Sequence, residues 1–215
     1  MTPLISEIAV SAPVTVWHDG KEIRTGIFKS PVAGRVSVTR AGIVGDGQAD
    51  LTVHGGRDKA VYVYPQCHYP TWASELAAAA LEPGQFGENL TVTAVSEATV
   101  NVGDRFRFGS VVAVVSQPRL PCFKLGIRMR DNAFPQRFLQ SGRLGFYLRI
   151  EEEGETEAGD AFALVEPAAH GITVTKLWET VFAPESTSEM AQCCLDLLPY
   201  LDAGWQRRLR QKAGR

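Results

Sequence analysis

The chain of 215 residues is organised around one stretch, Val-Val-Ala-Val-Val-Ser-Gln-Pro-Arg-Leu-Pro-Cys-Phe-Lys-Leu, at positions 111–125. Its first five residues form an apolar run that predicts a buried β-strand. Pro118 and Pro121 then lead the chain off the sheet and stiffen it, because each proline fixes φ near about −65° and removes a backbone donor. Cys122 follows the second proline directly, so its thiol is predicted to lie on a rigid loop.

Cys122 has a cation on either side, Arg119 before it and Lys124 after it. A thiol held between two cations should have a lowered pKa, so that the thiolate is populated. A thiolate is both a nucleophile and a soft metal ligand. The same residue also fits a small buried hydrophobe, since cysteine is among the most buried residue types. Both interpretations stay open at this point.

The composition is that of a globular protein with a real core, 45% hydrophobic and 21% charged with a formal net charge of −2. This charge indicates neither a nucleic-acid polymer nor an anionic membrane as a partner. No apolar run approaches the roughly 20 residues of a membrane span, and the N-terminus has no signal-peptide pattern, so we expect a cytoplasmic protein. Cys67, Cys122, Cys193 and Cys194 show no C-x-x-C pair, which argues against zinc and four-cysteine iron–sulfur sites.

The first hundred or so residues are predicted to be β-rich, with short apolar segments of strand length. Asp19-Gly20 predicts the turn of a two-residue hairpin, and Gly109-Ser110 predicts the turn of a second hairpin within 100–115.

Helical patterns interrupt and follow these strands. An alanine-rich segment predicts a helix over 70–81, and a further helix is predicted to begin at Phe123 and to continue toward residue 139. From His170 the periodicity predicts three short helices, the last of them capped by Asp202. Cys193 and Cys194 lie in this region, and we interpret both as packing residues.

A second chemical stretch, Leu-Thr-Val-His-Gly-Gly-Arg-Asp-Lys-Ala-Val-Tyr-Val-Tyr, occupies 51–64. Two glycines after a strand let the backbone approach a ligand closely and direct its N–H groups at an anion. His54, Arg57 and Lys59 add donors to such a site. A glycine-containing turn with a solvated, charged tip explains the same residues, because glycine patterns alone are weak motifs.

Four stretches together resemble signatures of the MOSC-domain family, which is related to the C-terminal part of molybdenum cofactor sulfurases. They are Gln-Pro-Arg-Leu-Pro-Cys-Phe-Lys-Leu (117–125), the run 46–64, Phe-Gly-Glu-Asn-Leu-Thr-Val (86–92) and Ser-Gly-Arg-Leu-Gly-Phe-Tyr-Leu (141–148). The chain resembles the small stand-alone YiiM-like branch over nearly its whole length. The resemblance implies a mainly β fold, with a MOSC β-barrel-like domain and peripheral helices over 1–168 and a C-terminal three-helix domain over 169–215.

The resemblance also implies a function. It implies the molybdenum cofactor (Mo-molybdopterin), with Cys122 as the protein ligand to molybdenum, and reduction of small N-hydroxylated compounds such as 6-N-hydroxylaminopurine and amidoximes. Pyridoxal phosphate is not expected. The chain has no flavin or nicotinamide fingerprint, so we expect electrons from a separate flavin-type reductase. A homodimer is compatible with the sequence.

The expected site combines both chemical stretches with residues from the other two signatures. Candidate catalytic residues are Cys122, His54 and Asp58. Candidate cofactor contacts are His54, Gly55, Gly56, Arg57, Lys59, Glu88, Asn89, Arg119, Lys124 and Arg143. Simpler roles remain open for two of these, because Asn89 can satisfy its own turn and Arg143 can be a surface turn residue.

Two other functions remain open from sequence. The protein could carry the cofactor, or carry sulfur as a Cys122 persulfide, without reducing a substrate. Such a carrier releases sulfur in a single turnover, whereas a reductase turns over repeatedly. A cysteine hydrolase with Cys122 and His54 is the third option, although no third, orienting residue is evident.

Overall fold

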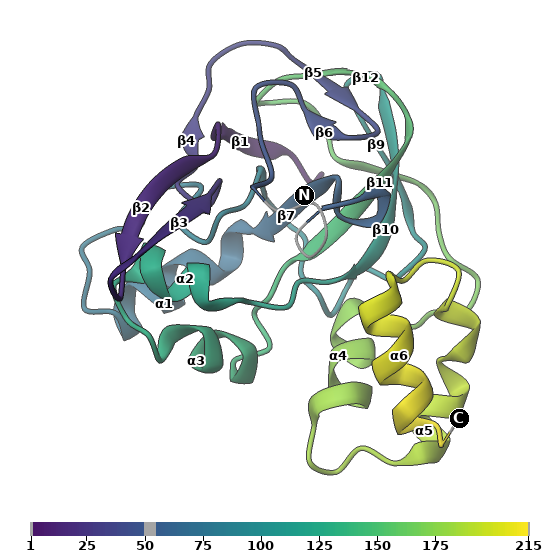
Figure 1. Cartoon of the computed structure of the whole chain (residues 1–215). Coiled ribbons are helices and arrows are strands. Elements are labelled where there is room, and N and C mark those ends of the chain that lie inside the picture. The colour runs from purple at the N-terminus through teal and green to yellow at the C-terminus, as the bar shows by residue number, and fades with distance from the viewer. Residues whose placement is uncertain (1, 50–54, 215) are drawn as a thin grey trace.

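The computed structural model describes residues 2–49 and 55–214 and is mostly β-sheet with helices around it (Figure 1). The described strands are β1 (Ile5–Val10), β2 (Val14–His18), β3 (Lys21–Thr25), β4 (Ser30–Pro31), β5 (Val36–Thr39), β6 (Gly42–Ile43), β7 (Val61–Pro65), β8 (Leu90–Val92), β9 (Arg105–Phe108), β10 (Val111–Pro118), β11 (Phe146–Glu152), β12 (Gly154–Thr156) and β13 (Ala163–Glu166). The described helices are α1 (Tyr69–Glu75), α2 (Phe123–Met129), α3 (Phe134–Gln140), α4 (Val174–Phe182), α5 (Ser188–Cys193) and α6 (Ala203–Lys212), with the short 3-10 turns η1 (Arg57–Lys59), η2 (Gln66–His68) and η3 (Leu195–Leu197).

The main sheet has eight strands in the order β13-β9-β10-β11-β7-β8-β1-β4. All its neighbours are antiparallel except β7 and β8, which run parallel. The N–H of Ile5 donates to the carbonyl of Asp160 (3.0 Å), and the N–H of Gly159 donates to the carbonyl of Ile5 (2.8 Å). These bonds join β1 to the segment before β13, so the two ends of the sheet approach one another as in a barrel. The predicted mainly β class is confirmed.

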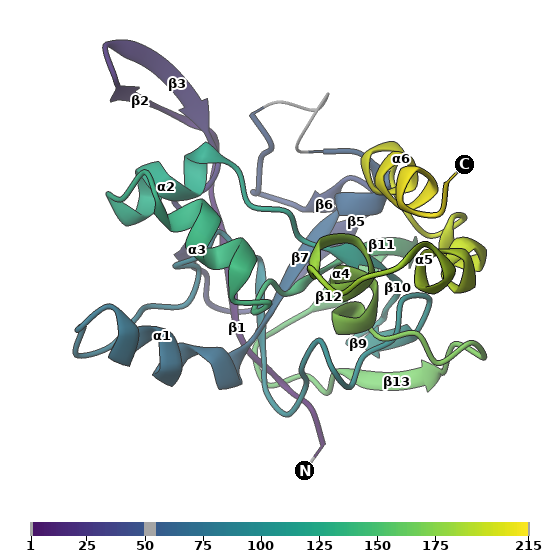
Figure 2. The ribbon, with the colours of Figure 1, turned by 90° about the horizontal axis from the view of Figure 1, so that it is seen from below.

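The strand before the cysteine loop, β10, is buried at all eight of its residues. Its hairpin with β9 turns at Gly109, whose φ is 55° and where a Cβ would lie 2.1 Å from the carbonyl oxygen of Glu155. The predicted hairpin at residues 19–20 is also present, with positive φ at Asp19 (49°) and Gly20 (74°) as a tight hairpin turn requires. The β2–β3 hairpin extends beyond the body of the molecule (Figure 2).

Two helix predictions are wrong in their extent. The helix predicted over 70–81 ends at Glu75, because Ala77 takes a left-handed φ of 51° and the N–H of Ala78 donates back to the carbonyl of Ala73 (2.9 Å). The helix predicted from Phe123 toward residue 139 is divided into α2 and α3. Arg130, with φ of 55°, ends α2.

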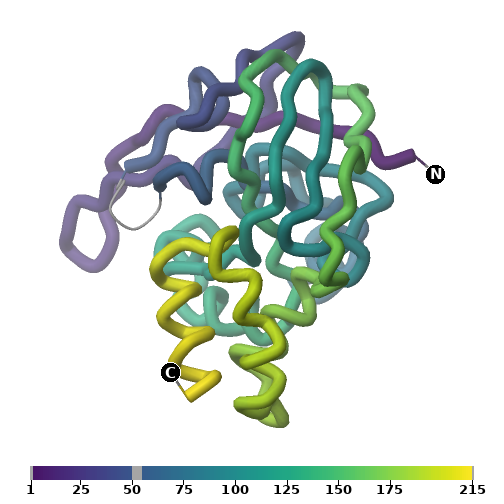
Figure 3. The backbone as a smooth tube through the Cα atoms, turned by 90° about the vertical axis from the view of Figure 1, so that its right-hand side faces the viewer, coloured from purple at the N-terminus to yellow at the C-terminus, as the bar shows by residue number. Residues whose placement is uncertain are grey.

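The C-terminal helices pack on the barrel at one end of its long strands (Figure 3). Their apolar residues Leu197, Trp205 and Leu209 belong to the same buried cluster as the barrel core. Asp202 caps α6 as predicted, its carboxylate accepting the N–H of Trp205 (2.8 Å). Cys194 packs in this region, but Cys193 is exposed, which corrects its predicted packing role. The domain division at residue 168 stays a prediction.

Within residues 2–49 and 55–214, we find no helix with both the length and the apolar character that crossing a membrane requires.

Candidate functional site

Cys122 lies on the short connection between β10 and α2, in the N-cap position of α2. Two contacts hold the preceding loop in place. The indole N–H of Trp205 donates to the carbonyl of Pro118 (3.1 Å), and the N–H of Arg119 donates to the carbonyl of Gly145 (3.3 Å). The thiol is therefore carried on a loop anchored to both the C-terminal unit and the start of β11.

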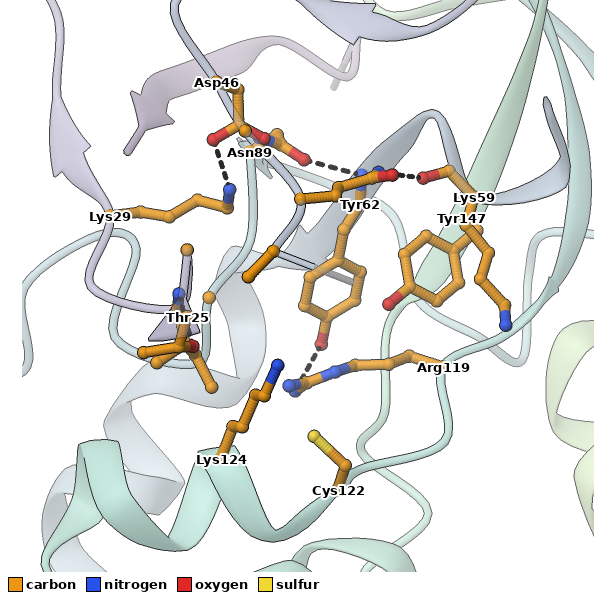
Figure 4. Close-up of a pocket in the computed structure, with 16 residues that line it drawn as sticks. Thr25, Lys29, Asp46, Lys59, Tyr62, Asn89, Arg119, Cys122, Lys124 and Tyr147 are labelled. Carbon is orange, nitrogen blue, oxygen red and sulfur yellow. Dashed lines mark hydrogen bonds and ion pairs between the residues drawn. The ribbon is translucent and has the colours of Figure 1, made fainter. Parts of the chain in front are cut away.

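Two cavities adjoin at this cysteine. Cys122, Lys59 and Tyr147 line both of them. The first, which we call the barrel cavity, lies among loops of the β domain and has a volume of about 90 Å³ (Figure 4). The second, which we call the helix-side cavity, is bounded by the start of α6 and has a volume of about 490 Å³. The sulfur is thus accessible from two sides.

Arg119 brings a buried positive charge to the sulfur. Its side chain lies under the barrel cavity, with the guanidinium 4.8 Å from the centre of the Tyr62 ring and its Nη1 donating to the Tyr62 hydroxyl (3.5 Å). Burial lowers the pKa of Arg119, but Tyr62, Tyr147 and Cys122 together raise it above its ordinary value, so the guanidinium stays charged. Figure 4 shows the Sγ of Cys122 pointing toward this group, with Lys124 beside it. A thiolate here faces two cations.

Two tyrosine hydroxyls complete this side of the site. Burial raises the pKa of Tyr62 well above its ordinary value, and its hydroxyl donates to the carbonyl of Leu144 (2.6 Å). Burial also raises the pKa of Tyr147, against the opposing effect of Arg119. Both hydroxyls therefore keep their protons at neutral pH and can act as donors.

The far wall of the barrel cavity contains a buried ion pair. The Nζ of Lys29 lies 2.5 Å from Oδ1 of Asp46. The carboxylate also accepts the N–H of Ser11 (2.9 Å) and the amide of Asn89 (2.9 Å). Burial lowers the pKa of Lys29, while Asp46 acts to raise it. This network fixes the loop around residue 46 against the sheet.

The helix-side cavity contains a second Lys–Asp pair. The Nζ of Lys59 lies 2.6 Å from Oδ2 of Asp202, and the N–H of Asp202 donates to the side chain of Gln117 (2.7 Å). Burial raises the pKa of Asp202, but the hydrogen bonds from Lys59, Trp205 and Gln117 hold it below its ordinary value overall. The pair connects η1 of the β domain to the first turn of α6.

Several predicted site residues meet around the sulfur. Lys59, Asn89, Arg119 and Lys124 line the barrel cavity with Cys122, and Gly55 lines the helix-side cavity. Gly56 lies next to Gly55, with a φ of 95° that favours glycine. His54 lies outside the described residues.

Other predicted site residues are engaged elsewhere. The carboxylate of Asp58 accepts the Nε of Arg149 (2.7 Å), and the side chain of Arg57 is 74% exposed. Glu88 is buried, and its carboxylate accepts the hydroxyl of Tyr69 and the N–H groups of Gly84 and Phe86. Arg143 pairs with Glu75 (2.7 Å) and lies over the ring of Trp72. None of these four is among the described residues that line the two cavities.

Sequence reasoning did not identify five residues that build the site: Lys29, Asp46, Tyr62, Tyr147 and Asp202. Asp46 and Tyr62 lie inside the 46–64 run that carried the family resemblance, which was the one signal available for them. Lys29 stands alone in its segment, and only the fold brings it to Asp46.

Comparison with known proteins agrees with this architecture. A family model described as MOSC domain matches residues 50–163. The uncharacterized protein YflK of Bacillus subtilis is 43% identical over 170 residues, which is 79% of this chain and 76% of YflK. A protein of Gibberella moniliformis named reductase is 37% identical over 153 residues, 68% of this chain but 27% of that larger protein.

A solved structure matches the whole chain. The crystal structure of YiiM from Geobacillus stearothermophilus has a TM-score of 0.82 to this protein at 28% identity, and the match covers 98% of both chains. The family model spans more than half of the sequence and includes the cysteine loop with β10 before it and α2 after it. The chain therefore belongs to the MOSC-domain family, as a YiiM-like protein.

Proposed function

We propose that this protein is a molybdenum-cofactor-dependent oxidoreductase that reduces small N-hydroxylated compounds with electrons from a separate reductase. The observation that carries the proposal is the position of Cys122, whose sulfur lies between two cavities beside two cations. Family membership supports a cofactor of the molybdenum type, and the relative named reductase supports redox chemistry.

The residues around the thiol fit a cofactor that combines a soft metal with an anionic group. A thiolate is a suitable ligand for a soft metal centre. Arg119 and Lys124 offer positive charge on the barrel side, and Lys59 lies where the two cavities meet. With about 90 Å³, the barrel cavity is too small for a whole pterin, so the cofactor would also need part of the larger helix-side cavity.

When bound, the cofactor would supply a metal centre that exchanges two electrons. The overall reaction takes two electrons and two protons, breaks the N–O bond of the substrate and releases water. In this assignment Cys122 holds the metal, Arg119 stabilises the thiolate, and Lys124 binds anionic oxygen.

Tyr147 is the residue we assign to proton donation. Tyr147 lines both cavities, and its raised pKa keeps the hydroxyl protonated at neutral pH. A general acid must be protonated at working pH and must lie within reach of the reacting group. Asp58 is a weaker candidate because Arg149 holds its carboxylate.

Steady turnover of an N-hydroxylated base or an amidoxime, with an artificial reductant, tests the proposal. The wild-type protein and the exposed-cysteine control Cys193→Ser should turn over repeatedly, and Cys122→Ala should be inactive. Tyr147→Phe should lower kcat about 100-fold or more, because positioned acids contribute at least that much. NADPH alone should give no turnover, and activity with it would exclude the separate reductase.

The persulfide carrier predicts different stoichiometry from the same samples. A carrier would release at most one sulfur per chain and would show no sustained reduction of any N-hydroxylated compound. That result, with a folded and cofactor-loaded protein, would replace the reductase proposal.

A further inference from the structure

A second thiol forms a cluster with two titratable groups outside the site described above. Cys67 is an exposed residue of η2, and its Sγ lies 3.8 Å from Nδ1 of His68. On the opposite edge of the same ring, Nε2 of His68 lies 2.6 Å from Oε2 of Glu97. The arrangement is therefore that of a catalytic triad, in which Cys67 is the nucleophile, His68 the base and Glu97 the residue that orients the base.

The carboxylate of Glu97 determines which nitrogen of the neutral His68 ring carries the proton. The side chain of Glu97 is only 4% exposed, and its second oxygen accepts the N–H of Gly145 (2.6 Å), so the carboxylate is held in one orientation. A carboxylate accepts, which places the proton of neutral His68 on Nε2 and leaves a lone pair on Nδ1. That lone pair faces Cys67. The S–H can also donate to the carbonyl of Val95 (3.6 Å), which keeps the thiol beside the ring.

The sulfur opens onto an apolar groove. The groove has a volume of about 620 Å³ and lies between η2, α1 and the loop that follows α1. Its walls include Tyr69, Pro70, Ala73, Leu81 and Ala94, together with Cys67 itself. Gln66 and Thr93 add polar side chains to the lining, but most of the surface is apolar, and a straight hydrocarbon chain fits it.

We propose that Cys67, His68 and Glu97 form an acyl-transfer site that takes an ester or thioester with an apolar acyl chain. The sulfur of Cys67 forms a bond to the acyl carbon, and the bond from that carbon to the leaving alcohol or thiol breaks. The thiol proton passes to Nδ1 of His68 and from there to the leaving group. Cys67 and His68 are the catalytic residues, and Glu97 is a positioning residue.

The base is needed because the thiol is not ionised by its surroundings. Burial, followed by the negative charge of Glu97, raises the pKa of Cys67 above its ordinary value. At Cys122, by contrast, the two cations Arg119 and Lys124 lie beside the sulfur. The ring of Tyr64 packs edge-on against His68 at 5.6 Å between centroids and adds no charge. Reactivity at Cys67 therefore depends on His68 as a base.

The test measures acylation of the full-length protein by p-nitrophenyl acetate and p-nitrophenyl hexanoate. Cleavage after Lys and Arg leaves Cys67, Cys122 and the 193–194 pair in three different peptides, so mass spectrometry assigns the modified cysteine. We expect the hexanoyl ester to modify Cys67 about 10-fold faster than the acetyl ester, because the longer chain buries additional CH₂ groups in the groove. At exposed Cys193 the longer ester should give no such gain.

His68→Gln separates catalysis from structure. Glutamine keeps an N–H that can donate to Glu97 but provides no base toward the sulfur. We expect this variant to keep the thermal midpoint of the wild type and to acylate Cys67 at least about 10-fold more slowly. Glu97→Gln should slow the reaction less and displace its pH profile, which a purely structural tether would leave in place.

Acylation of Cys67 at the rate of Cys193, or an unchanged rate in His68→Gln, would overturn the proposal and make Cys67 an ordinary surface thiol. The result is independent of the reductase assignment, because acylation of Cys67, measured on its own peptide, requires neither a metal nor Cys122.

Discussion

The two cavities that meet at Cys122 each contain a Lys–Asp ion pair, and the two pairs differ in their surroundings. Lys29 and Asp46 lie 2.5 Å apart with both side chains only 7% exposed. Lys59 and Asp202 lie 2.6 Å apart with side chains 19% and 21% exposed. The first pair is enclosed in the β domain, whereas the second joins the β domain to the C-terminal helices.

The comparison shows that two ion pairs of the same residue types can contribute differently to stability, depending on their burial. Removing one member of a buried pair leaves a charge without water or partner, and that loss is large. A partly exposed pair such as Lys59–Asp202 keeps some contact with water either way, so its loss is smaller. We infer that substitutions in the wall of the barrel cavity destabilise the protein strongly, whereas substitutions at the Lys59–Asp202 pair of the helix-side cavity destabilise it less.

Asp46→Asn should give the largest change. Lys29 would lose its carboxylate, and one of the two N–H groups from Ser11 and Asn89 would face an amide N–H. We expect the free energy of unfolding in urea to fall by about 3 kcal/mol. Glu157→Gln, at the exposed Arg35–Glu157 pair, is the matched control and should leave the free energy of unfolding almost unchanged, because water solvates both charges. Equal losses in both variants would remove the distinction between buried and exposed pairs.

Asp202→Asn should have a smaller effect. Asparagine is as good an N-cap as aspartate, so the cap of α6 survives and only the charge facing Lys59 is lost. We expect a loss of about 1 kcal/mol in urea unfolding. Asp202→Ala also removes the cap and should lose about 1 kcal/mol more. If the two variants were equally stable, the cap would contribute nothing at this helix.

The smallest effect is the pH dependence of the Asp202 contribution. The pKa of Asp202 is lower in the folded protein than its ordinary value of 3.8, so the unfolded chain binds more protons between the two values. The stabilisation is therefore present above pH 3.8 and is lost as the pH falls through the folded pKa. The stability difference between wild type and Asp202→Asn should shrink from about pH 6 to pH 3 in urea titrations. If the stability difference between the two proteins instead grew as the pH fell, the pKa of Asp202 would be raised by folding and not lowered.

Local chemistry predicted the turns and the cysteine loop well. Residues 19–20 have the composition that a tight hairpin turn requires, and Pro118 with Pro121 placed Cys122 off the end of β10. In the alanine-rich segment 70–81, helix propensity predicted a helix that continues over residues 76–81, but these six residues are not helical in the structure. The helix ends there because Ala77 adopts a left-handed backbone conformation, which the high helix propensity of alanine does not predict.

The polar framework of the site could not be predicted in the same way. Lys29 and Asp46, and likewise Lys59 and Asp202, are joined only through tertiary structure. Conversely, Glu88 and Arg143 were predicted to contact the cofactor, but their side chains are engaged by Tyr69 and Glu75. The sequence identifies which residues are charged donors and acceptors. The tertiary structure determines which of them pair with one another and which face a cavity.

The central claim is that Cys122 holds a molybdenum cofactor, and the direct measurement is molybdenum per chain by elemental mass spectrometry. Wild type, Cys122→Ala and the control Cys193→Ser would be purified from a host that makes the cofactor. We expect near-stoichiometric molybdenum in wild type and in Cys193→Ser, and almost none in Cys122→Ala. Equal molybdenum in all three proteins, or none in any folded sample, would contradict a cysteine-ligated cofactor at this site.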